Sequence, residues 1–423
     1  MLARFFNKAS IKQLVLSNIV SIIFIALSLI GMMLSELNSV YIFNELINRI
    51  SRNSFLVLSL LIPILAGLGL NFGLVIGAMA GQLSIIAVTY WQVEGIIGFL
   101  LCIILALPIS ILLGYLTGRL FNATKGQEMI AGLIVSFFAN GLYQFLLLVM
   151  VGTAIPMSNN VMIKPDGIGL RNTIALNGVN GNGGIKYALD GIFRLNLFYF
   201  IIILAVLLII YSLYNLERIK KDRIVKKSKE TYIVYVVASI VLIVISVLIL
   251  LGDNMYKNLK IPLITWIVIA VLCLFNKLIM RTKIGQNFRT VGHSQHIAKV
   301  AGINVNRTRI QAVIISTVLA SWGQIIFLQN IGTMNTYGSH MQVAMFSIAA
   351  ILIGGASVTN AKISHAITGV VLFHMIFIVS PTAGKALFGD AQIGEFFRAF
   401  VVYGVIGVSL GLHAWKKYKL GKM

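Results

Sequence analysis

The histidines are the residues of this sequence best suited to chemistry, because imidazole can bind a metal or transfer a proton near neutral pH. His365 and His374 stand nine residues apart, about half a turn out of phase on a helix of 3.6 residues per turn, so they face opposite sides. His293 and His296 are closer, but no cysteine or carboxylate lies beside them, and a zinc site is not indicated. No nucleophile, base and acid stand in a catalytic arrangement. We therefore expect neither an enzyme nor a cofactor nor a metal.

Neutral amides and aromatic rings within apolar stretches are the second set of residues with chemical potential. Amides can hydrogen-bond the hydroxyl groups of a neutral solute, and aromatic faces suit sugars or bases. The alternative is that the amides join neighbouring helices, as is common in membrane bundles. We predict a substrate pathway that includes Asn71, Gln82, Phe137, Asn140 and Gln324.

A short polar segment between apolar stretches, VGHSQHIAKVAGINVNRTR at 291–309, is the third feature. Ser294 can cap the start of a helix, and Gly302 can end it in the left-handed conformation. Between them, Ile297 and Val300 share an apolar side. Two turns are far fewer than the dozen or more residues that an isolated helix needs in water. The segment therefore predicts a short helix held by the rest of the protein or by a partner.

The elements that must position these residues are long apolar runs. The chain of 423 residues is 58% hydrophobic and 11% charged, with a mean hydropathy of +0.94, whereas soluble chains are about half apolar and a quarter charged. Runs of about eighteen residues or more indicate membrane-spanning helices. Runs that reach or approach this length occupy 13–34, 55–70, 73–91, 94–118, 128–151, 196–216, 231–252, 261–280, 310–330, 342–357, 364–381 and 395–414.

These runs predict an all-α integral membrane protein, a polytopic helix bundle of about 10–12 transmembrane segments. The pair 55–70 and 73–91 is separated by a glycine-rich stretch. It fits either two short spans or one broken, partly re-entrant element, which survives at membrane depth only where protein or a water-filled cavity satisfies its backbone.

The basic residues predict the orientation of the bundle. The net charge of +22 lies almost entirely in the gaps between runs, which fits a topology signal and membrane-lipid contact rather than nucleic-acid binding. One alternating set of gaps holds 24 of the 34 basic residues, and the positive-inside rule places it, with both termini, in the cytoplasm. That set includes a basic loop at 217–230 and the polar loop at 282–308. The opposite set includes an extracytoplasmic loop at 153–195.

The polar loop also carries the motif of a known family. It reads Val291-Gly292, five residues, Ala298, two residues and then Ala301-Gly302-Ile303, followed by basic residues and a span with small residues. "FSIAAILIGGASVTNAKISHAITGVVLF" and "NFGLVIGAMAGQ" are similar to the family's other small-residue motifs. The chain resembles the permease subunits of ATP-binding-cassette (ABC) importers, in the branch for ribose and other simple sugars, nucleosides and branched-chain amino acids.

The resemblance implies a type II-like importer permease in one transmembrane domain over 1–423, located in the bacterial cell membrane. A second permease chain, identical or homologous, would complete the pore, and an extracytoplasmic solute-binding protein would deliver the solute. A cytosolic ABC ATPase subunit would bind the loop at 282–308, through a coupling helix that comprises Gly292, Ser294, Ile297, Ala298, Val300, Ala301, Gly302 and Ile303.

Other functions remain open at this stage. An ion-coupled secondary transporter is the main alternative, although the acidic residues lie in predicted loops or at span ends, where ion-coupling groups are not usual. A membrane enzyme or an assembly scaffold is a further alternative. Amides and aromatic rings without buried charge favour a nucleoside or a simple sugar as the solute. Branched-chain amino acids stay open, because a helix terminus can bind a carboxylate.

Overall fold

The computed structural model describes residues 19–157, 162–178, 184–221 and 228–420, which are mainly helical. The first residues of the predicted cytoplasmic N terminus lie outside this part of the chain. The helices are α3 (Ile19–Leu34), α4 (Ser39–Leu58), α5 (Leu61–Leu65), α6 (Leu74–Tyr90), α7 (Gly95–Ala123), α8 (Glu128–Phe145), α9 (Leu197–Lys220), α10 (Lys229–Leu251), α11 (Leu263–Ile279), α12 (Lys283–His293), α13 (Gln295–Val300), α14 (Val305–Ile331), α15 (Val343–Ile353), α16 (Ile363–Phe388) and α17 (Ala391–Leu420). The remaining elements are the helical turns η1 (Leu146–Met150) and η2 (Met255–Asn258) and the strands β1 (Thr173–Ala175), β2 (Arg194–Asn196), β3 (Lys260–Pro262) and β4 (Thr333–Asn335).

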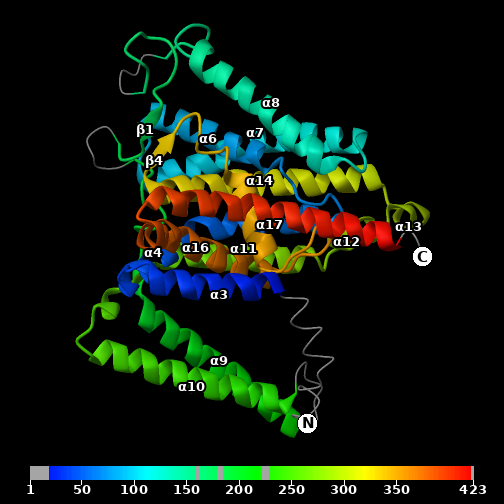
Figure 1. Cartoon of the computed structure of the whole chain (residues 1–423). Helices are drawn as coiled ribbons and strands as arrows, with labels where there is room; N and C mark the ends of the chain where they lie inside the picture. The colour runs from blue at the N-terminus through cyan, green and yellow to red at the C-terminus, as the bar shows by residue number, and fades with distance from the viewer. Residues whose placement is uncertain (1–18, 158–161, 179–183, 222–227, 421–423) are drawn as a thin grey trace.

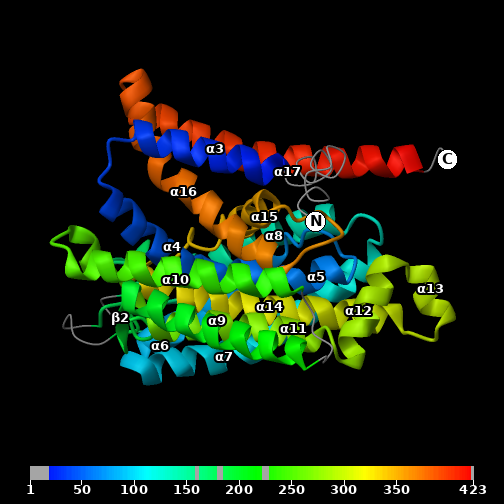
Figure 2. The same ribbon diagram turned by 90° about the horizontal axis from the view of Figure 1, so that it is seen from below.

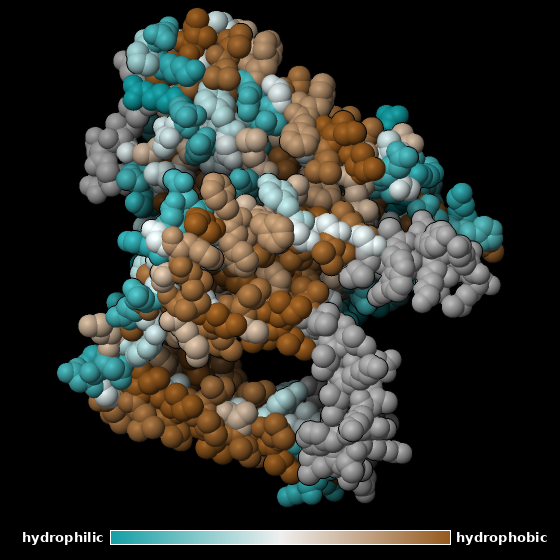
Figure 3. All heavy atoms as spheres, in the orientation of Figure 1, coloured by the Kyte–Doolittle hydropathy of each residue, from teal (hydrophilic) through white to brown (hydrophobic). Residues whose placement is uncertain are grey.

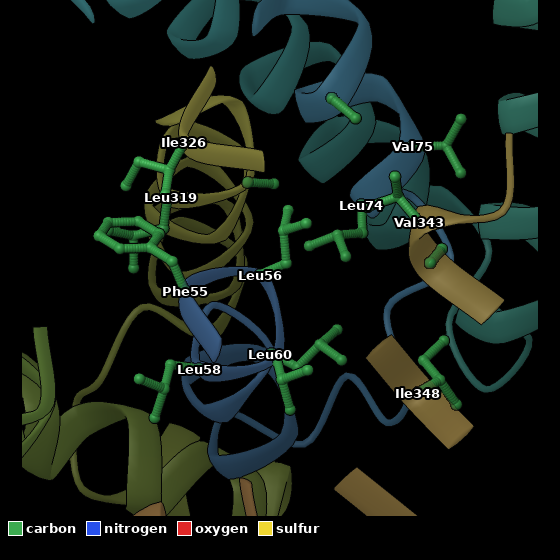
Figure 4. Packing of buried hydrophobic residues seen from close by; sticks show 14 of the residues in the cluster. Phe55, Leu56, Leu58, Leu60, Leu74, Val75, Leu319, Ile326, Val343 and Ile348 are labelled. Atoms are coloured by element: carbon green, nitrogen blue, oxygen red, sulfur yellow. The ribbon is translucent and has the colours of Figure 1, made fainter. Parts of the chain in front are cut away.

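The core lies where α4, α6, α14 and α15 meet. α14 packs against α7, α6 and α4, and α16 packs against α15, α3 and α4 (Figures 1 and 2). Leu56, Leu74, Leu319 and Ile348 come from the four central helices and belong to one buried cluster (Figure 4). Since lipid is as apolar as these side chains, van der Waals packing does more than hydrophobic burial to hold such helices together.

Small residues let α6 and α14 approach closely. A Cβ atom added to Gly77 or to Gly81 of α6 would lie 2.5 Å from a backbone oxygen of α14, that of Thr317 or of Ser321. Small residues at the contact allow this backbone proximity. The "GLVIGAMAG" stretch therefore packs α6 against α14.

The membrane-spanning character of the bundle is confirmed, although clear spans are fewer than expected. Seven of the described helices are long and apolar enough to cross a membrane, and counting the bent pair α11–α12 makes eight. The described part of α3, together with α6 and α15, adds shorter apolar helices. On the face that Figure 3 shows, apolar side chains dominate the middle, and polar ones gather at the left edge and at the right edge near α13. The count of 10–12 included these short helices and the run at 55–70.

The run at 55–70 is not a span of its own. It joins the end of α4, the short helix α5 and the start of a loop with positive φ at Gly67 and Gly69. α4 begins at Ser39, capped by the side chain of Asn38, and its middle carries charged side chains that lower its hydropathy. The run at 55–70 is therefore the end of a helix that breaks after Leu58, continues as α5 and then turns into α6. We call α5 and the turn that follows it the broken element.

The two ends of the bundle differ. At one end, which we call the strand end, β1 pairs with β4 and β2 with β3, both antiparallel. The predicted outer loop at 153–195 contributes β1 to this end, and Tyr337 Oη donates to the backbone oxygen of Leu170 (2.6 Å), so the described part of the loop is an ordered cap. At the opposite end, which we call the α13 end, lie α12, α13 and the end of α17 (Figure 1).

α9 and α10 form a hairpin that packs mainly on itself (Figure 1). Buried serines line the contact between the two helices, including Ser212 and Ser239. In the basic segment predicted as a loop at 217–230, residues 217–220 belong to the end of α9 and residues 229–230 to the start of α10. Residues 222–227 of that segment lie outside the described residues.

Candidate functional site

The helix–turn–helix at 282–308, which we call the docking segment, follows a bend of 74° between α11 and α12. The Thr282 Oγ1 accepts a hydrogen bond from the Gly285 N–H at the start of α12 (3.3 Å). The Ser294 Oγ accepts from the Ile297 N–H at the start of α13 (3.3 Å). Gly302 follows α13 with φ of 74°. The cap and the left-handed stop predicted from the sequence are both confirmed.

α13 buries its small residue and exposes its large apolar ones. Ala298 is buried in a cluster with Val291 and Val305, against which Ile303 packs. The Ile297 side chain is 54% exposed and the Val300 side chain is 79% exposed. The small cluster fixes α13 against its neighbours, so these two side chains are held outward. Exposed apolar side chains that lie side by side on a helix are typical of a contact surface.

The docking segment touches the broken element directly at Gly292. A Cβ atom on Gly292 would lie 2.2 Å from the Leu65 backbone oxygen, and one on Gly67 would lie 2.7 Å from the Gly292 Cα. Backbone therefore meets backbone where α12 crosses the turn between α5 and α6. A displacement of α12 must push on this turn, since no side chain lies between them to absorb it.

A buried ion pair joins the next elements at the same end. Arg309, in the second turn of α14, forms an ion pair with Glu128 at the start of α8 and donates to the Phe121 backbone oxygen in α7 (3.0 Å). The Arg309 side chain is 1% exposed. Motion of the docking segment can thus reach α7 and α8 through one guanidinium group. Arg309 stands one residue before the apolar run at 310–330, so the hydropathy pattern did not identify it as a buried charge.

Asn71, the first predicted pathway residue, has a structural position. Its Oδ1 accepts from the Gly73 N–H (3.0 Å) and its Nδ2 donates to the Ser316 Oγ (3.4 Å). The Ser316 Oγ in turn donates to the Ser59 backbone oxygen (3.0 Å). These bonds satisfy the backbone of the broken element and tie it to α14.

Three other predicted pathway residues meet around the 336–342 loop. The Gln82 Oε1 lies 2.6 Å from the His340 Nδ1 and accepts from the Tyr143 Oη (3.1 Å), and the Asn140 Oδ1 position lies 2.8 Å from the His340 Nε2. Gln324 donates to the Ser339 backbone oxygen (3.2 Å). The polar side chains thus join helices to the loop, which is the interhelical alternative considered above. His340 was not predicted from the sequence, because its neighbours in "TYGSHMQ" do not indicate that it would hydrogen-bond residues of other helices.

Phe137 does not join this group. Its side chain is 69% exposed on α8, a helix that packs mainly along α6 and α7 and of which few residues are buried. Proximity in the sequence to Asn140 therefore does not bring Phe137 into a pathway within this chain.

Burial lowers the pKa of His340 to about 4. Between that value and the usual 6.5, the unfolded chain binds more protons than the folded one, so stability falls as pH falls through this window. We expect a loss of up to about 3 kcal/mol between pH 7 and pH 4 from this residue. His340→Gln should flatten the decrease of melting temperature with acid in detergent solution, whereas His293→Gln on the exposed end of α12 should keep it. Equal slopes in the wild type and in the His340 variant would contradict the assignment.

A polar cavity opens at the strand end and has a volume of about 470 Å³. The buried carboxylate of Asp190 accepts from the Asn330 Nδ2 (2.6 Å) and from the Thr265 hydroxyl. Arg52 approaches Glu45 across 3.3 Å and Asn330 across 3.5 Å. These groups are thus paired with each other in the cavity wall. We call this cavity the outer cavity. Its walls are Asn44, Glu45, Asn48, Arg52, Tyr187, Asp190, Arg194, Asn258, Lys260, Pro262, Asn330 and Ile331.

A family model described as the branched-chain amino acid transport system / permease component matches residues 181–406, more than half of the chain. The chain belongs to this permease family. The matched part of the permease includes the docking segment, α14 and the 336–342 loop. The residues before 181, including the broken element and α8, lie outside the match.

The permease also resembles curated proteins over parts of its length. It is 38% identical over 93 residues to the autoinducer 2 import system permease protein LsrC of Klebsiella pneumoniae, which is 22% of this chain and 26% of LsrC. It is 30% identical over 148 residues to the probable ABC transporter permease protein YphD of Escherichia coli (35% and 42%). It is 26% identical over 167 residues to the xylose transport system permease protein XylH of Haemophilus influenzae (40% and 42%).

These matches span between a quarter and about two fifths of the relatives' own lengths. No solved structure matches the permease significantly.

Proposed function

We propose that this permease is the pore-forming subunit of an ATP-driven, binding-protein-dependent importer in a bacterial cytoplasmic membrane. A cytosolic ABC ATPase would supply the energy, a second permease chain would complete the pore, and an extracytoplasmic binding protein would deliver the solute. The name of YphD, a probable ABC transporter permease, supports the mechanism class. The α13 end would face the cytoplasm, as the excess of basic residues favours.

The observation that carries this proposal is the exposure of Ile297 and Val300 on a short helix that the protein itself holds in place. A partner that covered these two side chains would gain apolar burial at little entropic cost, because α13 is already ordered. The ATPase is the partner that the family resemblance implies for this segment.

Two contacts provide a route from the docking segment to the spans. Gly292 contacts the turn before α6 through its backbone, and Arg309 of α14 bonds to groups of α7 and α8. When the ATPases close, a displacement of α13 would move both groups together. Because packed helices shift between discrete arrangements rather than bending continuously, this motion would alternate access between the two sides.

The solute would be a small neutral molecule, with a simple sugar first. XylH is a xylose transport permease by name. The outer cavity is lined by four amides, five charged side chains and the Tyr187 hydroxyl, which are polar groups that can hydrogen-bond the hydroxyls of a sugar. A nucleoside is the alternative solute, and the uptake assay described next distinguishes the two.

The test is uptake by the purified complex in proteoliposomes. The tagged permease would be isolated from its native membrane with its associated chains, and uptake of radiolabelled sugars and nucleosides would be measured with and without internal ATP. We expect ATP-dependent uptake of a sugar. Uptake that continues without ATP and stops with an ionophore would instead indicate a secondary transporter.

A further inference from the structure

The α9–α10 hairpin is attached to the bundle mainly at one end. The two helices pack chiefly on each other, and their contacts with the rest of the chain are concentrated at the strand end, at β2 and η2. There the Asn196 side chain caps the start of α9, and the Phe200 ring packs edge-on against the Trp266 ring of α11, with centroids 5.7 Å apart. From this attachment the hairpin extends along the outside of the bundle toward the α13 end (Figures 1 and 2).

A narrow seam holds the two helices together. Apart from Asn215, their buried residues recur at every seventh position, which places them on one side of each helix. Most of them are small, and small residues let two helices in a membrane approach closely. The seam consists of Phe198, Ala205 and Ser212 in α9 and of Tyr232, Ser239 and Ser246 in α10.

The other faces of the hairpin are suited to lipid. They carry mainly leucine, isoleucine and valine, and Leu207, Ile210, Val241 and Leu248 are among the exposed side chains. Figure 3 shows this apolar surface along the bottom of the molecule. A contact with another membrane helix is usually rich in small and polar residues, which these faces largely lack. Since lipid tails are as apolar as leucine, lipid is the partner that fits these faces.

Tyrosines indicate where the hairpin leaves the hydrocarbon region. Tyr211 and Tyr214 lie near the end of α9, and Tyr232 and Tyr235 near the start of α10. The Tyr232 ring meets Tyr211 and Tyr235 edge-on, with centroids 6.1 Å and 6.3 Å away, so these rings lie at one level. Tyrosine is enriched where membrane meets water. The 24 residues of α9 extend about 36 Å, enough to cross a hydrocarbon core of about 30 Å, which puts this level at the headgroups opposite the strand end.

Basic side chains follow directly beyond the tyrosines. Arg218 lies with its guanidinium carbon 5.9 Å from the centroid of the Tyr214 ring. Lys221 pairs with Glu217, whereas Lys220 and Lys229 are exposed and pair with no carboxylate of the described residues. Positive charge therefore exceeds negative charge at the level of the headgroups. We call this set the basic end of the hairpin, consisting of Arg218, Lys220, Lys221 and Lys229.

Helix stability does not account for these charges. Arg218 and Lys220 stand in the last turn of α9, where the helix dipole favours a cation. Lys229, however, is the first residue of α10, where the same dipole disfavours a cation. A partner outside the two helices explains both positions. Lipid phosphates lie at this level, and the cytoplasmic leaflet carries a negative surface potential.

We propose that the basic end of the hairpin binds the headgroups of anionic phospholipids in the cytoplasmic leaflet. Lysine and arginine side chains would form charge-assisted hydrogen bonds with the phosphate oxygens, and the apolar faces of α9 and α10 would contact the acyl chains. Bound lipid would hold the end of the hairpin that the bundle leaves unsupported. The proposal does not depend on the proposed function, because lipid binding can be measured on the permease chain alone.

The experiment titrates the purified full-length permease with dioleoyl phosphatidylglycerol and, separately, with dioleoyl phosphatidylcholine, and counts bound lipids by native mass spectrometry. We expect tighter binding of phosphatidylglycerol, and a smaller preference at about 0.5 M salt, because salt screens exposed charges. Each basic side chain near an anionic surface strengthens binding about fivefold. Replacing all four residues of the basic end with glutamine should therefore weaken the tightest phosphatidylglycerol binding on the order of 100-fold. A wild type without preference for phosphatidylglycerol would overturn the proposal.

The matched control removes four other exposed charges from the predicted cytoplasmic side. Arg119→Gln, Lys125→Gln, Arg281→Gln and Lys362→Gln, combined in one chain, change the net charge by the same amount at exposed positions outside the hairpin. This variant should keep the tight binding. Equal weakening in the two variants would indicate a general effect of net charge and would contradict a site on the hairpin.

Two further results decide between lipid and protein as the partner and cover a loss of folding. A hairpin variant that binds phosphatidylglycerol as tightly as the wild type but loses a co-purifying protein would overturn the proposal in favour of a protein contact. If the fourfold variant does not elute as a folded chain in size-exclusion chromatography, Lys220→Gln with Lys229→Gln gives the same test. Both side chains are exposed, and their loss should weaken phosphatidylglycerol binding about 25-fold; an unchanged affinity would contradict the proposal.

Discussion

Replacing Ile297 or Val300 with aspartate is expected to abolish ATP-driven uptake while the permease remains folded in the membrane. Both side chains are exposed in the isolated chain, so the substitutions remove no internal packing. In the assembled importer, the new carboxylate would be buried without a partner, which costs several kcal/mol. Since each 1.4 kcal/mol is a factor of ten, the affinity for the ATPase should fall about 100-fold or more.

The measurement compares uptake and co-purified ATPase for both variants with the wild type. Gln295→Asp is the control, because it places a carboxylate two residues from Ile297, on the other side of α13 and at the helix N terminus, where a negative charge is favourable. It should transport normally. Normal uptake in both Ile297→Asp and Val300→Asp would contradict the proposal that α13 docks onto the ATPase.

Arg309→Met is expected to destabilise the permease by about 3–5 kcal/mol, because it leaves the carboxylate of Glu128 buried without its partner. Arg309 also donates to the Phe121 backbone oxygen, so α7 loses a contact at the same time. Thermal unfolding in detergent, followed by size-exclusion chromatography, would show a clearly lower melting temperature together with loss of uptake.

The double variant Arg309→Met, Glu128→Gln tests the reason for that loss. With the charge on residue 128 removed, most of the stability should return, since replacing both members of a buried pair is often nearly neutral. If the double variant also recovers uptake, the pair acts as packing. Recovery of stability without uptake would indicate that the ion pair transmits motion. A single variant as stable as the wild type would contradict the importance of the pair.

Features that depend on neighbouring residues were predictable from the sequence. The cap at Ser294 and the stop at Gly302 follow from local hydrogen bonding and from the conformational freedom of glycine. Most apolar runs coincide with helices, because a helix is the one structure that satisfies its own backbone in lipid. The docking segment was found for these reasons.

Most of α4 was not predicted as a helix, because its sequence combines apolar and charged residues. Glu45, Arg49 and Arg52 lie in the middle of the helix and form ion pairs. The apolar run predicted from hydropathy therefore covered only the last residues of α4. Glu45 and Arg52 line the outer cavity, a position that no stretch of sequence reveals. The break between the runs 55–70 and 73–91, which lies between α5 and α6, was predicted, but its contact with Gly292 could be seen only in the fold.

The candidate site depends on contacts between distant parts of the chain. Gln82 and Asn140 were singled out as amides in apolar runs, but His340, which joins them, lies about 200 residues further on. Phe137 was grouped with them from its place in the sequence, but its side chain is exposed on α8, because sequence proximity does not say which part of α8 meets the bundle.

The most direct test of the central claim is to identify the partners of the permease. The tagged chain would be extracted gently from its native membrane, and the co-purifying proteins would be identified and quantified by mass spectrometry. We predict a stoichiometric ABC ATPase subunit that is lost in Ile297→Asp. A permease that emerges alone, reproducibly and in several mild detergents, would contradict the ATP-driven mechanism.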